Sequence, residues 1–396
     1  MAKMHNIDEI LTRGVEEVVD RKHLEAALRG KKKLRFKLGI DPTAKQIHIG
    51  RAVVLWKLRD LQDLGHKIVL IIGDFTGLIG DTSDKDSERP MLSKKQVAEN
   101  MKGYIEQIGK ILNLKKTEIH YNSDWLKKLG YLEIAEQANE FSLHEFEARD
   151  NIARRMKDQK RVSLRELLYP LMQGYDSVAI KASVEVGGTD QRFNLLAGRT
   201  LQKKYGQEPQ DIMTFTLLEG TDGRKMSSSW GNVINITDSP NDMYGKTMSI
   251  LDSLIVKYLL LCTRLPLAQI EQLENKMQSG ELNPRDAKAL LAKELVRMYH
   301  GAKAAEVAEQ NFDKVHRYHD VPPDMPEFKL AQFGQETNKV LRVMIAMGAA
   351  KSMSEARRKA DQGGVKINGR AHQGYDYDFK SGDVIQVGPL KWAKIN

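Results

Sequence analysis

A strand, a polar loop, a helix and a second strand follow one another early in the chain, and this succession constrains the fold more than any other feature. Apolar residues alternate with polar residues or glycine over 34–40, which predicts a strand. Leucines and valines recur at helical spacing over 54–64, and Gly65 stands where a helix takes its C-terminal glycine. A second buried-strand pattern follows at 68–72. The unit is therefore βαβ, and such units bind ligands in the loops at the carboxyl ends of their strands.

The loop of this unit contains His48, Ile49, Gly50 and Arg51 directly before the helix. Gly50 allows a bulky ligand to approach the backbone, and the N-terminus of the helix favours an anion. An ordinary polar loop between a strand and a helix is the alternative. By itself, the loop predicts a phosphate site and nothing more specific.

The composition is that of a globular chain without a membrane segment. Of the 396 residues, 41% are hydrophobic and 29% are charged, and no apolar run reaches the length that spans a membrane. The first residues lack the apolar core of a signal peptide, so we expect a cytoplasmic protein. The single cysteine, Cys262, excludes an internal disulfide and a cysteine-ligated metal cluster, and its apolar neighbours predict core packing.

Positive charge is concentrated near the C-terminus. The formal net charge of the chain is +9, and residues 334–396 contribute 11 Lys and Arg against 6 Asp and Glu, a net of +5. More than half of the net charge therefore lies in a short segment, which favours contact with a polyanion there.

Strand and helix patterns alternate over residues 1–235, which predicts an α/β domain. Within it, 7–28 look helical and amphipathic, and a capping box at Ser93 opens a helix to about Asn113. Residues 131–162 are strongly charged and helical in pattern, so we expect them to leave the sheet as an insertion.

Two further domains are expected after the first. Residues 236–320 show long helical patterns, which predict a helical domain. A Pro-rich linker is expected at 321–333, and 334–396 would form a small α+β domain. In that domain, the Asn368-Gly369 step predicts a type I′ hairpin.

A second glycine-flanked motif, KMSSS at residues 225–229, follows Asp222 and Gly223. A cation and several hydroxyl groups on a flexible loop suit the negative charge of a leaving pyrophosphate. Alone, such a motif is more often a polar surface loop. Together with His48, at the other end of one α/β domain, it forms a specific pair.

This pair resembles the His-Ile-Gly-His and Lys-Met-Ser-Lys-Ser motifs of class I aminoacyl-tRNA synthetases. The stretches GIDPTAKQIHIG, DFTGLIGD and VGGTDQRFN resemble the bacterial tyrosyl-tRNA synthetases among them, as does the set Tyr169, Gln173 and Asp176. Near the C-terminus, MSEARRKADQGGVKING resembles the S-four-like RNA-binding domain of these enzymes. The resemblance covers nearly the whole chain.

The resemblance implies a Rossmann-like parallel-sheet catalytic domain, then an α-helical domain and a small α+β RNA-binding domain. It implies that tyrosine attacks the α-phosphate of ATP, and that the tyrosyl group then passes to the 3′-end of tRNA(Tyr). Because a free carboxylate is already ionised at neutral pH, no general base is needed. Mg²⁺ would enter with ATP as part of the substrate, without a protein metal site or a tightly bound cofactor. A homodimer is implied, with 131–162 contributing to its interface.

The resemblance also assigns roles to individual residues. Those implied in catalysis are Thr43, His48, Lys85, Arg89 and Lys225. Those implied in ATP binding are Gly39, Asp41, His48, Gly50, Arg51, Gly188, Asp190, Lys225, Ser227 and Ser228. Those implied in tyrosine binding are Asp81, Tyr169, Gln173, Asp176 and Gln191. For Lys85 and Arg89, a solvated charge run is the alternative.

Three of the tyrosine-binding residues share one face of an apolar helix. Tyr169, Gln173 and Asp176 stand at helical spacing, and a polar stripe on such a segment is costly to bury without partners. Three satisfied core residues are the alternative. Pro170 predicts a kink in this helix or its start.

The sequence departs from the family pattern at three positions. Arg51 replaces the second histidine of the first motif, and Ser228 replaces the second lysine of the other. Lys37 stands where one branch of the family has a tyrosine that contacts the substrate, and we assign it no role.

Arg357, Arg358 and Lys359, in the C-terminal basic segment, are hypothesised to contact tRNA phosphates. Two rival functions remain open at this stage. A tryptophanyl enzyme is the nearer one, although Asp176 and the C-terminal domain favour tyrosine. The other is a non-catalytic RNA-binding protein on a synthetase scaffold, with Arg51 and Ser228 as signs of lost catalysis.

Overall fold

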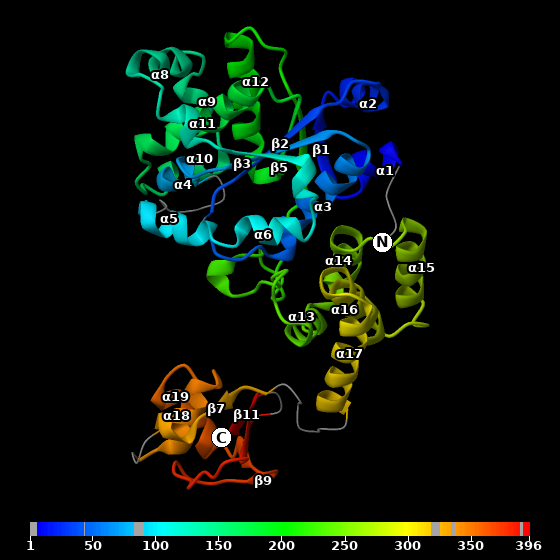
Figure 1. Ribbon diagram of the computed structural model, residues 1–396, viewed down its shortest axis with the longest axis vertical. Helices are drawn as coiled ribbons and strands as arrows, with labels where there is room; N and C mark the ends of the chain where they lie inside the picture. The colour runs from blue at the N-terminus through cyan, green and yellow to red at the C-terminus, as the bar shows by residue number, and fades with distance from the viewer. Residues whose placement is uncertain (1–5, 43, 83–90, 318–324, 334–336, 389–390) are drawn as a thin grey trace. The chain divides into compact units, whose positions relative to one another are not determined.

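The computed structural model describes residues 6–42, 44–82, 91–317, 325–333, 337–388 and 391–396. The chain divides into two compact units, one up to Ala302 and one from Lys303. Each unit has its own sheet and its own core (Figure 1). Among the described residues, no helix has both the length and the apolar character required to cross a membrane.

The first unit is built on a six-stranded sheet in the order β1-β6-β5-β2-β3-β4. All neighbours are parallel except β1, which is antiparallel to β6 at the edge. In the order of the sheet, the strands are β1 (Val15–Val19), β6 (Asp211–Phe215), β5 (Val184–Gly188), β2 (Arg35–Ile40), β3 (Lys67–Ile72) and β4 (Thr117–Tyr121).

The chain reverses its direction of winding between β2 and β5. From β2 the chain proceeds to β3 and β4 on one side, and from β5 to β6 on the other. At such a switch point, the loops after the two strands diverge and leave a crevice at their carboxyl ends. The fold therefore places the loop after Ile40 beside the loop after Gly188.

Helices cover the sheet on both faces, and Figure 1 shows α3 and α6 on one side and α11 and α12 on the other. The helices of the sheet region are α1 (Ile7–Thr12), α2 (Arg21–Arg29), α3 (Ile49–Asp63), α4 (Thr76–Ile79), α5 (Lys94–Met101), α6 (Tyr104–Gly109), α7 (Ser123–Leu126), α8 (Tyr131–Ala138), α9 (Leu143–Glu147), α10 (Asp150–Lys157), α11 (Leu164–Ile180) and α12 (Arg192–Lys204). Helices α13 (Pro240–Met248), α14 (Ile255–Cys262), α15 (Leu267–Gln278) and α16 (Pro284–His300) complete the unit.

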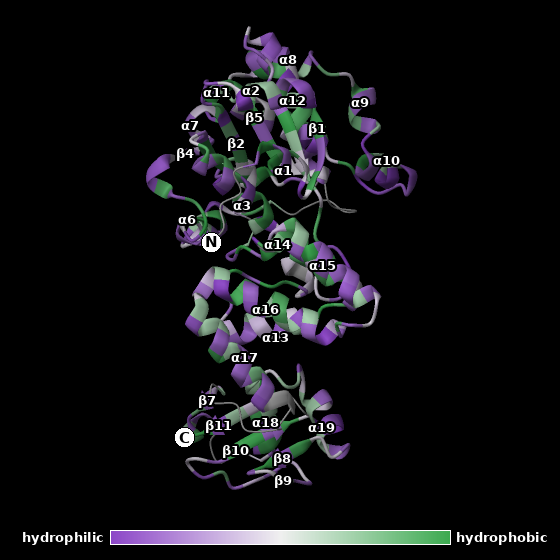
Figure 2. Ribbon diagram, turned by 90° about the vertical axis from the view of Figure 1, so that its right-hand side faces the viewer, coloured by the Kyte–Doolittle hydropathy of each residue, from purple (hydrophilic) through white to green (hydrophobic). Residues whose placement is uncertain are grey.

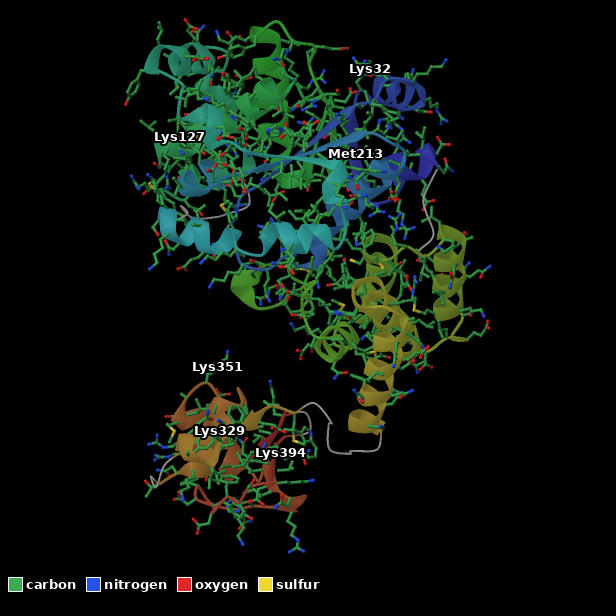
Figure 3. All side chains as sticks on the ribbon, in the orientation of Figure 1. Lys32, Lys127, Met213, Lys329, Lys351 and Lys394 are labelled. Atoms are coloured by element: carbon green, nitrogen blue, oxygen red, sulfur yellow. The ribbon has the colours of Figure 1, made fainter. Side chains whose placement is uncertain are left out.

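Several predicted elements are confirmed. The central βαβ unit appears as β2, α3 and β3, with Gly65 at a φ of +86° behind the last turn of α3. Ser93 forms its capping box with Gln96. Residues 131–162 form the helices α8 to α10, and Cys262 is buried. Figure 3 shows Met213 of β6 in the interior of this unit and Lys32 and Lys127 at its rim.

Two local expectations are wrong, and a third is narrowed. Residues 7–28 are not one helix, because Gly14 adopts a φ of +68° and the valine-rich segment after it pairs with β6 as β1. The helix from Ser93 ends at Met101, since Gly103 takes a left-handed conformation. Of the kink or helix start expected at Pro170, the start is excluded, because α11 begins at Leu164 and Pro170 lies inside it.

The second unit begins with α17 (Ala302–Arg317) and contains a five-stranded sheet in the order β7-β11-β10-β8-β9. Its strands are β7 (Glu327–Phe328), β8 (Val365–Ile367), β9 (Arg370–Ala371), β10 (Val384–Val387) and β11 (Lys391–Ile395). Because β7 pairs with β11, part of the expected linker 321–333 belongs to this sheet. The predicted hairpin is confirmed, with Asn368 and Gly369 both at positive φ between β8 and β9.

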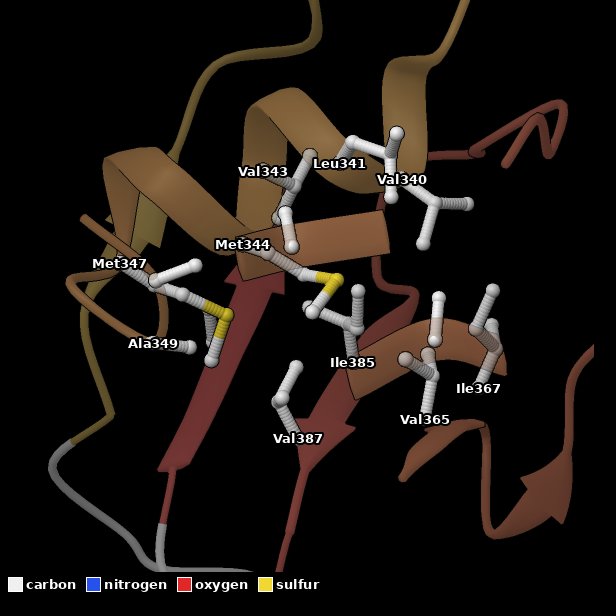
Figure 4. Packing of buried hydrophobic residues seen from close by; sticks show 14 of the residues in the cluster. Val340, Leu341, Val343, Met344, Met347, Ala349, Val365, Ile367, Ile385 and Val387 are labelled. Atoms are coloured by element: carbon white, nitrogen blue, oxygen red, sulfur yellow. The ribbon is translucent and has the colours of Figure 1, made fainter. Parts of the chain in front are cut away.

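Helices α18 (Lys339–Ala346) and α19 (Met353–Asp361) cover one face of this sheet. Figure 2 shows apolar residues along β8, β10 and α18. In Figure 4, Val343 and Met344 of α18 point toward Ile385 of β10 and Val365 of β8, and all four are fully buried. This core is separate from that of the six-stranded sheet, so the basic segment forms a folded module.

Candidate active site

A cavity of about 570 Å³ lies at the switch point of the six-stranded sheet. It is lined by every described residue to which the sequence assigned catalysis, ATP binding or tyrosine binding: Gly39, Asp41, His48, Gly50, Arg51, Asp81, Tyr169, Gln173, Asp176, Gly188, Asp190, Gln191, Lys225, Ser227 and Ser228. Thr43, Lys85 and Arg89 lie outside the described residues. The structure thus brings together the two motifs and the polar face of α11.

His48 forms the N-cap of α3. Its Nδ1 accepts a hydrogen bond from the backbone N–H of Arg51 at 3.3 Å, which leaves Nε2 as the protonated nitrogen of the neutral ring. Burial, and then the positive charges of Arg51 and Lys225, lower the pKa of His48 to about 3. His48 is therefore a neutral imidazole at physiological pH, able to donate one hydrogen bond to an anion.

The chain just after the KMSSS segment pairs through its backbone with the His48 loop. Ile49 N–H donates to the carbonyl of Ile234 at 2.8 Å, and Ile236 N–H donates to the carbonyl of Ile47 at 2.9 Å. A side chain added at Gly50 would crowd the His48 ring and the Met226 sulfur, whereas glycine permits this approach without displacing either group. The two motifs consequently lie against each other in one wall of the cavity.

Asn232 holds the KMSSS loop in shape. Its side-chain oxygen accepts from Ser227 N–H at 2.9 Å, and its amide donates to Asp222 at 2.7 Å and to the Lys225 carbonyl at 3.2 Å. From this loop, the Lys225 ammonium reaches Asp190 at 3.0 Å. A cation from the loop after β6 thus meets a carboxylate from the loop after β5.

On the α11 side, a chain of hydrogen bonds connects the polar groups of the cavity. The Tyr169 hydroxyl donates to Asp41 at 2.9 Å, and Thr76 donates to the other oxygen of Asp41 at 2.7 Å. Asn122 donates both to Thr76 at 2.9 Å and to Asp176 at 3.3 Å. All these groups therefore have partners, and their orientations are set before any ligand binds.

Asp176 is the buried carboxylate of the cavity. Trp125 donates to it from Nε1 at 2.7 Å. Burial raises the pKa of Asp176 to about 7, although the positive charge of Lys37 and the hydrogen bonds from Trp125 and Asn122 act in the opposite direction. A carboxylate held in this way is a strong acceptor for a ligand hydroxyl.

A second carboxylate, Asp81, accepts from the Gln191 amide at 2.6 Å. Asn194 in turn donates to the Gln191 oxygen at 3.1 Å. The pair places one negative charge and one amide on the cavity wall. Asp81 and Gln191 are 110 residues apart in the chain, so no local sequence pattern predicts their contact.

Sequence reasoning missed several residues of this site. Thr76, Tyr104 and Asn122 line the cavity, while Trp125 and Asn232 orient residues that do. Asn122 directly follows the strand pattern of β4, and Trp125 lies on α7 after it. Neither residue type suggests a role until its contact with Asp176 is known. Their roles depend on contacts between segments far apart in the chain.

Arg51 fills the position of the expected second histidine. Its guanidinium donates to the Tyr104 hydroxyl at 2.7 Å, so the cation is held at the cavity wall beside His48. Arg357 and Arg358 belong to the second unit, where both are exposed on α19. Lys359 is more engaged, because its ammonium donates to the Ala349 carbonyl at 2.6 Å and pairs with Glu355 at 2.9 Å.

Replacing Arg51 with histidine should raise the KM for ATP about three- to tenfold, because a fixed cation at the anion-binding end of α3 is lost. ATP–pyrophosphate exchange at varied ATP measures the effect. Tyr104→Phe is the matched control, since it removes the hydroxyl partner and keeps the charge. Equal kinetics of the wild type and Arg51→His would mean that the departure from the motif is neutral.

Comparison with known proteins agrees with this geometry. Residues 29–317 match the family model of the class I tRNA synthetases (W and Y). The tyrosine–tRNA ligase of Thermotoga maritima is 45% identical over 391 residues, covering 98% of this chain and 96% of that protein. The tyrosine–tRNA ligase of Haemophilus influenzae is 44% identical over 398 residues, covering 100% of this chain and 98% of that protein.

Among solved structures, a C-terminally truncated mitochondrial tyrosyl-tRNA synthetase of Coccidioides posadasii matches with a TM-score of 0.62 and 25% identity. The match covers 77% of this chain and 90% of that one. The family match and the near-complete alignment with the ligases agree with each other. The chain therefore belongs to the class I tRNA synthetases (W and Y), and within them to the tyrosine–tRNA ligases.

Proposed function

We propose that this enzyme forms tyrosyl-adenylate from L-tyrosine and ATP in the switch-point cavity and then transfers the tyrosyl group to the 3′-end of tRNA(Tyr). One observation carries the assignment of the site. Asp176, a buried acceptor suited to a phenol hydroxyl, lines the same cavity as His48 and Lys225, which suit the phosphates of ATP. The cavity thus has one end for each substrate.

In the tyrosine half of the site, Asp176 accepts from the substrate phenol. Tyr169, Gln173 and Asp81 surround its ammonium, and Gln191 lies beside Asp81. The substrate carboxylate is the nucleophile and needs no base, so the protein contributes position and charge.

In the ATP half, the neutral His48 donates to a phosphate oxygen and Lys225 attracts the pyrophosphate as it leaves. Gly39, Gly50 and Gly188 allow the nucleotide close to the backbone, while Asp190 faces the ribose. Thr43 contacts the ATP phosphates, and Lys85 and Arg89 contact the pyrophosphate. The remaining residues assigned to ATP binding are Asp41, Arg51, Ser227 and Ser228. Mg²⁺ arrives bound to ATP, mainly through its phosphate oxygens.

Amino-acid-dependent exchange between ATP and pyrophosphate tests the activity. We expect exchange with tyrosine and none above background with tryptophan or phenylalanine. Stimulation by tryptophan alone would overturn the choice of substrate. RNA binding without any tyrosine-dependent exchange would instead favour a non-catalytic protein on this scaffold.

We propose that the catalytic domain spans 1–235 and the helical domain 236–320, with the RNA-binding domain at 334–396 after a linker. Arg357 and Arg358 are exposed on α19 and can approach tRNA phosphates, with the Arg357 guanidinium 5.7 Å from the centre of the Tyr375 ring. Lys359 contributes less because it is bound locally. These groups would supply the salt-dependent part of tRNA affinity.

The double substitution Arg357→Gln with Arg358→Gln should weaken tRNA(Tyr) binding. The slope of the logarithm of the binding constant against the logarithm of salt concentration should become less negative by about 1.5. Each lost phosphate contact removes roughly one released counterion. The matched control is Arg21→Gln with Lys22→Gln, an adjacent pair of exposed cations on α2. Unchanged affinity and slope in the α19 variant would contradict the proposal.

We further propose that the enzyme is a cytoplasmic homodimer and that 131–162 contribute to its interface. Large apolar side chains are exposed there, with Tyr131 94% exposed and Leu132 75% exposed. Such a patch on a soluble protein is typical of an interface. Sedimentation of Tyr131→Ser with Leu132→Ser should show monomers if α8 is part of that interface, and an unchanged dimer would exclude α8 from it.

A further inference from the structure

Lys37 is wholly buried directly behind the α11 wall of the cavity, although the motifs give it no role. It lies on β2, opposite Glu185 of β5 in the sheet register. Its ammonium donates to the Gln173 carbonyl and to Ser177 Oγ, both at 2.7 Å, and pairs with Glu185 Oε1 at 2.9 Å. The three N–H groups of the ammonium are therefore all satisfied.

Glu185 is equally buried and accepts from the neutral groups around it. Its Oε1 accepts from Gln173 Nε2 at 3.1 Å. Its Oε2 accepts from Ser177 Oγ at 3.0 Å and from Gln210 Nε2 at 2.5 Å. An anion with this many donors is held in one position.

This arrangement determines which way the Gln173 side-chain amide faces. With the amide nitrogen bound to the Glu185 carboxylate, the amide oxygen is the atom left for the cavity that Gln173 lines. The reversed amide would set its oxygen against a carboxylate, which is repulsive. An oxygen facing the cavity can accept from a substrate ammonium, whereas an NH₂ group cannot.

We propose that Lys37 and Glu185 form a buried positioning pair that turns the Gln173 amide oxygen toward the ammonium of tyrosine and acts on Asp176 through two opposite charges. The inference rests on the proposed tyrosine site and adds two residues that do not touch substrate. Lys37 holds the Gln173 backbone, Glu185 holds its amide, and the two opposite charges act together on the neighbouring carboxylate.

Two charged side chains on neighbouring strands shift the pKa of Asp176. Lys37 of β2 lowers its pKa and Glu185 of β5 raises it, while Trp125 and Asn122 are neutral donors. Of the helices packed on α11, α4 has no charged residue. The charged side chains of the other three, α7, α8 and α12, are exposed or contact other groups: Asp124, Glu133, Glu136, Arg192, Arg199, Lys203 and Lys204.

The two members of the pair therefore predict opposite shifts in a pH profile. Tyrosine binding requires ionised Asp176, so kcat/KM for tyrosine falls as pH drops through its pKa. Lys37→Met removes a positive neighbour and should move this acid limb to higher pH. Glu185→Gln removes a negative neighbour and should move it to lower pH. A merely structural defect would not produce shifts of opposite sign.

The test measures ATP–pyrophosphate exchange of the full chain at varied tyrosine, ATP and pH. Both variants should raise the KM for tyrosine about tenfold, with the KM for ATP within about twofold of the wild type. Lys57→Met is the matched control, because Lys57 is a second buried lysine, which donates to the Ile10 carbonyl instead. It should leave the KM for tyrosine and the acid limb in place.

The double variant Lys37→Met with Glu185→Gln keeps the proposal testable if a single variant fails to fold, since removing both charges leaves neither unpaired. It should keep the raised KM for tyrosine while the acid limb returns toward that of the wild type. Binding of tyrosine and of its analogue without the amino group gives a second measurement. In Glu185→Gln, the ratio of the affinity for tyrosine to the affinity for this analogue should be smaller than in the wild type.

The outcomes separate this inference from the proposed function. A wild type without tyrosine-dependent exchange or tyrosine binding would overturn both. An active wild type, with Lys37 and Glu185 variants that keep its KM for tyrosine and its pH profile, would overturn the positioning pair alone.

Discussion

Asp176→Asn should lower kcat/KM for tyrosine about 10²-fold, the loss expected when a charged acceptor of a buried hydroxyl becomes a neutral one. The asparagine keeps the volume and can still accept from Trp125, so the cavity should retain its shape. Discrimination against phenylalanine should fall at the same time, because the phenol hydroxyl then contributes less binding free energy. ATP–pyrophosphate exchange with both amino acids measures the two effects.

The same substitution should make the free enzyme more stable at pH 8. The carboxyl group ionises near pH 4 in an unfolded chain and at about 7 in the folded one, so the folded state binds its proton more tightly. The free energy of unfolding therefore falls as pH rises between those values, and a neutral asparagine avoids this loss. Thermal unfolding at pH 8 should show a higher Tm for the variant than for the wild type.

Asp124→Asn is the control for both measurements, because Asp124 is an exposed carboxylate on the helix that carries Trp125. It should change neither the exchange kinetics nor the Tm. An Asp176→Asn enzyme with wild-type kcat/KM for tyrosine would remove Asp176 from the tyrosine site.

Lys225→Met should reduce kcat for adenylate formation about 10²- to 10³-fold, with the KM for tyrosine within about twofold of the wild type. The charge on the pyrophosphate grows as its bond to the α-phosphate breaks, so a cation held at that place stabilises the transition state more than the ground state. In the proposed site, Lys225 would carry this role without the second lysine of its motif, whose position is taken by Ser228. Single-turnover formation of tyrosyl-adenylate measures the rate.

Lys204→Met is the matched control, since Lys204 is also a partly buried lysine in an ion pair, with Glu140 at 3.6 Å, and does not line the cavity. Its rate should equal that of the wild type. If Lys225→Met changed only the KM for ATP and left kcat intact, Lys225 would bind the ground state rather than the transition state.

The sequence by itself determined the fold class, the central βαβ unit, the separate C-terminal module and the two motifs, around His48 and Lys225, that line the cavity. Each depends on signals within about 20 residues: the period of apolar positions, a glycine behind a helix, or an asparagine–glycine turn. The same local reasoning failed over 7–28. There, the helical spacing of apolar residues competed with a valine-rich segment whose pairing partner, β6, lies about 200 residues away.

Only the tertiary structure decided which side chains share a cavity, which of them contact each other, and whether His48 is protonated there. Burial, together with the cations Arg51 and Lys225, makes His48 neutral, and Lys225 meets Asp190 across two loops. Lys37 had no role by sequence and became half of a buried ion pair because β2 and β5 are neighbours at the switch point. Hydrogen bonds and charges act over a few ångströms in space. Residues far apart in the chain come within that distance only when the sheet has assembled, so a local sequence pattern cannot predict their contacts.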